Sequence, residues 1–208
     1  MSTIDDTGTA VALRDGSSVV VRAVRPEDRE LLLAGFERLG PASRYQRFLA
    51  PMAELTDDIV TYLTDVDHHD HEALAAIDAA TGEGVGVARF VRCASRPDTA
   101  EAAVTVIDDW QGRGVGTALL DLLAERAREE GVARFTALLL AENREMLELL
   151  DTIGSVRVVD RQSGTVEIEA ELASTGAGPV LHGVLGASAR GPVRLGVRRS
   201  GPGPAAPA

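Results

Sequence analysis

Lysine is absent from this 208-residue chain, so all 21 of its basic residues are arginine. This absence excludes a catalytic or Schiff-base lysine and the lysine of a P-loop. Cys93 is the only cysteine, which excludes an internal disulfide and a cysteine-based zinc site and makes a cytoplasmic, reducing setting our expectation. Aromatic residues make up only 3% of the chain, so the core must consist mainly of alanine, valine, leucine and isoleucine.

Long hydrophobic runs are missing as well. No apolar stretch approaches the roughly 20 residues that a membrane-spanning helix needs. Residues 1–10 are acidic and lack the basic start and apolar stretch of a secretory signal. We therefore expect neither a membrane association nor secretion.

Acidic residues outnumber basic ones by 32 to 21, which gives a formal charge of −11. The imbalance is uneven, because residues 173–208 contain four arginines and no acid. The strong excess of acidic residues before residue 173 argues against nucleic-acid binding, because such binding depends on basic side chains that neutralise phosphates. It suits cationic substrates instead.

Composition divides the chain into three parts. Residues 1–16 are polar and unpatterned, which predicts a flexible leader. Residues 17–172 show the patterning of a folded domain. Residues 173–208 are rich in glycine, proline and alanine, which predicts a basic, disordered tail because little apolar surface is available to bury.

Between the two ends, strand-like and helix-like segments alternate. Strands are expected over residues 18–24, 72–78, 86–93, 101–107, 135–140, 156–160 and 165–172. Helices are expected after residues 25–28 and over 41–48, 56–63, 114–130 and 143–152. We therefore predict a single α/β (α+β) domain with a mixed central sheet of about seven strands flanked by helices.

The most informative segment is Asp-Asp-Trp-Gln-Gly-Arg-Gly-Val-Gly-Thr, residues 108–117, between a predicted strand and the longest helix. Glycines at this spacing let the backbone approach a ligand, and free N–H groups at a helix start favour an anion such as a pyrophosphate. A P-loop is excluded by the missing lysine, and a dinucleotide fingerprint by Thr117 or Leu119 at the third glycine position. A glycine-rich helix start without a ligand is the structural alternative.

The spacing Gln111-x-x-Gly114-x-Gly116 resembles the coenzyme A pyrophosphate loop of the GNAT superfamily of N-acetyltransferases. The predicted element order over residues 17–172 is similar to that fold throughout. Three short segments resemble the acetyltransferase domain of bacterial protein-lysine acetyltransferases. They are residues 43–48, residues 86–91, and residues 100–101 where they precede residues 109–111.

The resemblance implies acetyl-CoA as co-substrate and no metal. It implies Glu101 as the general base, which removes a proton from the acceptor amine; the alternative is a solvated glutamate at a strand entry. Arg113 either meets a phosphate or is simply exposed. The cofactor-binding residues that the resemblance implies are Val104, Thr105, Val106, Gln111, Gly112, Arg113, Gly114, Val115, Gly116, Thr117 and Asn143.

Two features depart from the family pattern or stand outside it. Leu150 occupies the position where many members carry a tyrosine that protonates the departing thiolate, so the general acid is unassigned. The stretch from Asp67 to Glu72 resembles a metal cluster by composition, but we interpret it as a solvated loop that could line the substrate entrance.

These observations favour an acetyl-CoA-dependent N-acetyltransferase whose preferred acceptor is a protein lysine. Two alternatives stay open: an acetyltransferase for a small amine such as an aminoglycoside or polyamine, and a non-catalytic module that senses acyl-CoA. The sequence identifies neither the acceptor nor the oligomeric state.

Overall fold

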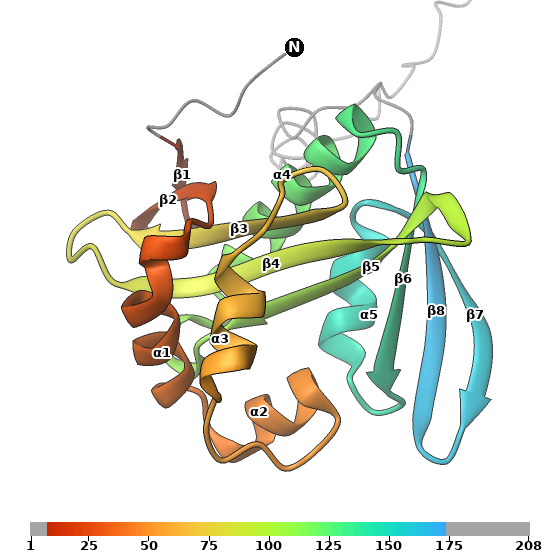
Figure 1. Ribbon diagram of the computed structural model, residues 1–208, viewed down its shortest axis with the longest axis horizontal. Coiled ribbons are helices and arrows are strands. Elements are labelled where there is room, and N and C mark those ends of the chain that lie inside the picture. Colours follow the sequence, from red (N-terminus) through yellow and green to blue (C-terminus); the bar gives the residue numbers. More distant parts are fainter. Residues whose placement is uncertain (1–7, 174–208) are drawn as a thin grey trace, which may run out of the picture. The chain divides into compact units, whose positions relative to one another are not determined.

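A computed structural model describes residues 8–173, so the predicted tail from residue 174 onward lies outside the described residues. The described strands form one sheet in the order β1-β2-β3-β4-β5-β6-β8-β7, in which only β5 and β6 run parallel (Figure 1). This confirms the predicted mixed sheet. The strands are β1 (Thr9–Ala12), β2 (Ser18–Ala23), β3 (His71–Asp78), β4 (Gly84–Cys93), β5 (Arg96–Val106), β6 (Arg134–Leu140), β7 (Gly154–Gln162) and β8 (Thr165–Leu172).

Strand β1 corrects the prediction for residues 9–12, which were assigned to the leader. These four residues form a hairpin with β2, in register from Thr9 opposite Val21 to Ala12 opposite Ser18. The strand is short and only weakly patterned, so its partner rather than its own sequence stabilises it. The sheet therefore has eight strands in the described region instead of about seven.

Within residues 8–173, five α-helices and two short 3₁₀ helices connect the strands. Figure 1 shows α1, α2 and α3 on one face of the sheet and α4 on the opposite face. The helices are η1 (Pro26–Asp28), α1 (Arg29–Glu37), α2 (Pro41–Phe48), α3 (Asp57–Thr64), η2 (Asp108–Trp110), α4 (Val115–Glu129) and α5 (Arg144–Asp151).

Helix α4, the longest helix of residues 8–173, packs on the sheet through an apolar stripe that fixes its position. Leu119, Leu120, Leu123 and Ala127 are fully buried against the sheet, as the helical spacing predicts. Gly86 on β4 allows this close approach, because a Cβ there would lie 3.0 Å from the side chain of Leu119. The N-terminus of α4 is thereby fixed beside the end of β5.

None of the helices in residues 8–173 combines the length and the apolar character that a bilayer-spanning helix requires.

Candidate active site

Strands β5 and β6 separate in the middle of the sheet. Their parallel ladder ends at the pair of Glu101 and Thr136. Beyond this pair, residues 102–106 keep β4 as their only strand partner in the described part of the chain. The free edge of β5 therefore offers backbone donors and acceptors to an extended ligand, in the way that an added strand would use them.

The glycine loop lies at the end of this opening and presents a run of free amides. Gly112 and Gly114 have φ values of +73° and +104°, which L-residues with side chains rarely adopt. Across residues 112–117, no backbone N–H donates a hydrogen bond to any residue that the structure describes. A helix start normally leaves the first few N–H groups free, and the loop extends this set into a cradle for an anion.

A set of polar contacts holds the loop in place. The side-chain amide of Gln111 donates to the carbonyl of Val106 at 3.0 Å and to Ser43 Oγ at 3.3 Å. Ser43 Oγ in turn donates to Asp108 at 2.7 Å, and the same carboxylate accepts from the backbone N–H of Gly40 at 3.1 Å. Gln111 therefore braces the loop against β5 and α2 through its side chain.

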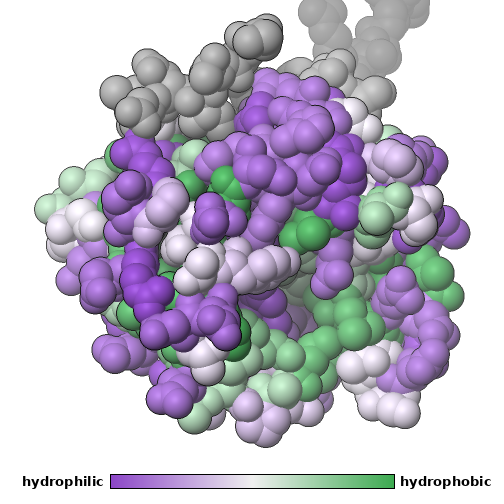
Figure 2. All heavy atoms as spheres, in the orientation of Figure 1, coloured by the Kyte–Doolittle hydropathy of each residue, from purple (hydrophilic) through white to green (hydrophobic). Residues whose placement is uncertain are grey.

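The separation of β5 and β6 and the glycine loop together form a cleft of about 680 Å³, within the usual size range of ligand sites. In the space-filling view the surface between α2 and α5 is hollowed and bordered by apolar side chains (Figure 2). The structure brings most of the predicted site residues to this cleft, namely Glu101, Val104, Thr105, Val106, Gln111, Gly112, Gly114, Gly116, Thr117 and Asn143.

Two predicted cofactor-binding residues do not line the cleft. Val115 is buried in the core on the first turn of α4. Arg113 lies over the ring of Trp110 at 4.7 Å and forms an ion pair with Asp15 at 3.4 Å. Its guanidinium is thus committed to groups of the chain itself.

Glu101 stands where the two strands part, and its side chain is exposed to the cleft. Arg47 of α2 lines the same cleft, and its guanidinium packs on the ring of Phe48 at 5.1 Å. Burial lowers the pKa of Arg47, while the negative charge of Glu101 acts in the opposite direction. Behind it, burial and the charge of Arg47 lower the pKa of Arg89 to about 10.

Asn143 serves as the N-cap of α5 and also borders the cleft. Its Oδ1 accepts a hydrogen bond from the backbone N–H of Met146 at 3.1 Å, which is the usual role of a capping asparagine. Its Nδ2 donates to no acceptor among residues 8–173, so that group is available to a ligand. The capping bond therefore leaves Asn143 able to serve as a cofactor-binding residue as well.

Leu150 is fully buried in the core. Its position therefore presents no group to the cleft. Both tyrosines of the chain, Tyr45 and Tyr62, are exposed and lie outside the cleft lining. The structure thus brings no tyrosine of the described chain to the place where a thiolate would leave.

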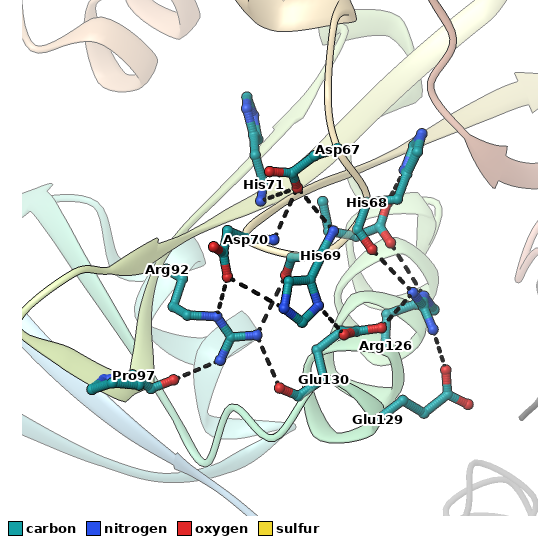
Figure 3. A network of polar contacts seen from close by, with 11 residues as sticks. Asp67, His68, His69, Asp70, His71, Arg92, Pro97, Arg126, Glu129 and Glu130 are labelled. Atoms are coloured by element: carbon teal, nitrogen blue, oxygen red, sulfur yellow. Dashed lines mark hydrogen bonds and ion pairs between the residues drawn. The ribbon is translucent and has the colours of Figure 1, made fainter.

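The histidine-rich stretch does not line the cleft, contrary to the expectation that it could border the substrate entrance. It belongs instead to a polar network at the C-terminal end of α4 (Figure 3). His68 Nδ1 lies 2.7 Å from the buried carboxylate of Glu72, which also accepts from Arg126 Nε at 3.2 Å. Arg126 continues the network to Glu130 at 3.1 Å.

The same network fixes the loop before β3. One oxygen of Asp67 accepts from the backbone N–H groups of residues 69, 70 and 71 at 2.8–2.9 Å. Arg92 of β4 donates to Asp70 at 2.7 Å and to the carbonyl of Glu130 at 2.9 Å. Within residues 8–173, no group of His, Cys, Asp and Glu side chains is arranged to hold a metal ion. The stretch therefore anchors the far end of α4.

Sequence reasoning missed several residues of the cleft. They include Arg14, Ser43, Arg47, Glu145, Met146, Glu148 and Leu149. Met146 and Leu149 look like ordinary apolar positions of a helix. Ser43 and Arg47 belong to the phrase at residues 43–48, which was used only for the family resemblance. Arg14 lies in the segment that was predicted to be a leader, and nothing in its sequence context, apart from the Asp-Gly pair that follows it, pointed to a binding role.

Comparisons with known proteins agree with this geometry. The family model described as "Acetyltransferase (GNAT) family" matches residues 35–154. Among solved structures, the GNAT domain of S. lividans PAT superposes with a TM-score of 0.73 at 35% sequence identity, over 79% of this chain and 96% of that one.

Two curated relatives are also similar in sequence. Acetyltransferase Pat of Mycolicibacterium smegmatis is 36% identical over 148 residues, which are 71% of this chain and 44% of that protein. Acetyltransferase PA5475 of Pseudomonas aeruginosa is 34% identical over 156 residues, which are 74% of this chain and 83% of that protein. The chain thus spans less than half the length of the Mycolicibacterium relative.

Proposed function

The chain belongs to the GNAT acetyltransferase family, and from that premise we propose that it transfers the acetyl group of acetyl-CoA to the ε-amine of a protein lysine, with Glu101 as general base. The observation that carries the proposal is the position of Glu101 at the point where β5 leaves β6, in the same cleft as the glycine loop.

The cleft supports a bound coenzyme along its whole length. The free amides of residues 112–117 suit a diphosphate, since they lie at the positive end of the α4 dipole. The unpaired edge of β5, at Val104, Thr105 and Val106, suits the amide groups of a pantetheine arm. Asn143 offers Nδ2 from the opposite side of the cleft.

The chemistry requires a neutral amine. A lysine with the ordinary pKa of about 10.4 is neutral in only about one molecule in 10³ at pH 7, which costs about 4–5 kcal/mol. Glu101 accepts the proton, directly or through a water molecule. The amine nitrogen then bonds to the acetyl carbonyl carbon, the C–S bond breaks, and the nitrogen gives up its second proton to the departing thiolate or to water. Glu101 passes the first proton to solvent.

Two further features fit this reaction. A backbone N–H near Val106 is suited to stabilise the negative charge that develops on the carbonyl oxygen. The thiolate leaving group needs little protonation near neutral pH, because a thiol has an ordinary pKa of about 8.5. The buried Leu150 in place of a tyrosine is therefore compatible with turnover.

A cationic acceptor fits the charges of the cleft. Glu145 and Glu148 line it together with Glu101, so the lining carries three carboxylates against the two guanidinium groups of Arg14 and Arg47. A small polyamine would meet the same charges. The choice of a protein lysine rests on the resemblance of residues 43–48, 86–91 and 100–101 to the protein-lysine branch.

Acceptor profiling with labelled acetyl-CoA tests the proposal. Lysine-containing peptides and proteins from a cell extract are compared with polyamines and aminoglycosides, and Glu101→Gln is run in parallel. Because the chain contains no lysine, acetyl-lysine signal cannot come from its own side chains. Label on protein lysines that Glu101→Gln abolishes supports the proposal. Label confined to small amines contradicts the protein acceptor, and thiol release from neither class of acceptor contradicts the enzymatic function.

A further inference from the structure

The glycine loop supplies partial positive charge through its free amides and the start of α4, and a guanidinium beside it would add a full charge. A diphosphate carries two negative charges, and arginine can form strong, often bidentate, charge-assisted hydrogen bonds with phosphate oxygens in addition to those from backbone amides. This chain has no lysine. Arg113, the arginine inside the loop, is already paired with Asp15 and packed on Trp110. An arginine that adds to the backbone amides at the diphosphate would therefore come from another segment.

The β1–β2 turn meets the glycine loop directly. The backbone N–H of Arg14 donates to the carbonyl of Arg113 at 3.3 Å. Next to it, Asp15 pairs with the Arg113 side chain at 3.4 Å and accepts from the backbone N–H of Ser17 at 3.0 Å. The buried side chain of Leu13 anchors the turn in the core. The turn is thus fixed to the loop by one backbone bond and one ion pair.

These contacts place the Arg14 side chain at the mouth of the cleft. A Cβ built on Gly114 would lie 3.8 Å from both Cγ and Nε of Arg14, so this side chain passes over the residue that caps α4. Arg14 lines the cleft, and its guanidinium makes no hydrogen bond or ion pair with residues 8–173. Arg47, the other arginine of the lining, belongs to α2 and lies near Glu101.

We propose that Arg14 is a phosphate ligand, which reaches from the β1–β2 turn and binds the pyrophosphate of acetyl-CoA in the cradle of residues 112–117. The inference rests on the proposed use of acetyl-CoA. Asp15 acts as the positioning residue, because it neutralises Arg113 and holds the turn against the loop. Strand β1, which the sequence did not predict, thereby becomes part of the coenzyme site.

Isothermal titration calorimetry of acetyl-CoA tests this assignment without relying on turnover. A hydrogen-bonded charge pair of this kind corresponds to a loss of about 10- to 100-fold in affinity when it is removed. Arg14→Gln is expected to weaken binding by that factor, and Arg14→Lys by less. Arg161→Gln is the matched control, because Arg161 is exposed on β7 and does not line the cleft. Unchanged thermal unfolding of Arg14→Gln shows that the fold is intact.

A second ligand shows whether Arg14 binds the pyrophosphate or the 3′-phosphate of the coenzyme. Acetyl-dephospho-CoA lacks the 3′-phosphate and keeps the pyrophosphate, so Arg14→Gln is expected to weaken its binding by the same factor. An effect that disappears with this ligand would assign Arg14 to the 3′-phosphate and overturn the proposal. Equal affinity of Arg14→Gln and the unaltered chain for acetyl-CoA would overturn it as well. If the unaltered chain binds no acetyl-CoA, the proposed function fails and this assignment fails with it.

Discussion

Replacing Glu101 by glutamine removes the proposed proton acceptor and keeps the size of the side chain. In the proposed mechanism the unaltered enzyme offsets most of the roughly 4–5 kcal/mol needed at pH 7 to obtain a neutral lysine amine. A positioned general base contributes about 10²–10⁴-fold to the rate. We therefore expect Glu101→Gln to lower kcat by that factor. Acetyl-CoA affinity should stay nearly unchanged, because the amides of residues 112–117 remain in place.

The pH dependence provides the sharper readout. Without a base, the variant depends on amine that is already neutral, and this fraction rises tenfold per pH unit below pH 10.4. The difference in kcat between the two enzymes should therefore shrink steadily from pH 7 to pH 9. Thiol release with a lysine peptide measures both rates, and Glu54→Gln, an exposed loop position outside the cleft, is the control. Equal rates and parallel pH profiles for Glu101→Gln and the unaltered enzyme would remove Glu101 from the mechanism.

Three further predictions concern the scaffold. Gly114→Ala, at φ +104°, should lower stability by about 1–2 kcal/mol and weaken acetyl-CoA binding; undiminished affinity in calorimetry would contradict the site. The bond to Glu72 raises the pKa of His68, so protonated His68 contributes fully to the stability of the fold below pH 6.5. This contribution is lost as the pH rises through the pKa that His68 has in the folded state. NMR titration should show a lower pKa of His68 in Glu72→Gln. Gly154→Ala would place a Cβ 1.7 Å from the carbonyl oxygen of Glu171 and should prevent β7 from pairing, so a melting temperature equal to that of the unaltered chain would refute the packing.

Most of the fold could be predicted because its local signals agree with its tertiary structure. The apolar stripe of α4 and the glycine at residue 131 that follows it define the longest helix, and the structure buries that stripe. Strand β1 was missed because residues 9–12 carry almost no signal of their own and are stabilised by pairing with β2. Boundaries also shifted, since β5 begins at Arg96 rather than near Glu101.

The residues of the candidate site likewise fall into those that a local motif predicts and those that only tertiary contacts bring to the cleft. Residues of the loop and of β5 could be predicted, because glycines and a strand-borne glutamate form a contiguous motif. The contact of Ser43 with Asp108 spans 65 positions, and Arg14 meets the loop about 100 positions away. Nothing in one sequence encodes such pairings locally. Arg113 was expected at the coenzyme, but its partner Asp15 is equally distant in sequence.

Hydrogen–deuterium exchange of the backbone amides, with and without saturating acetyl-CoA, tests the central claim most directly. The amides of residues 112–117 have no acceptor among the described residues, so they should exchange rapidly in the free protein and become protected on binding. Protection should also extend to residues 104–106 on the free edge of β5. Rapid exchange at residues 112–117 in the bound state, with protection elsewhere, would place the coenzyme outside this cleft.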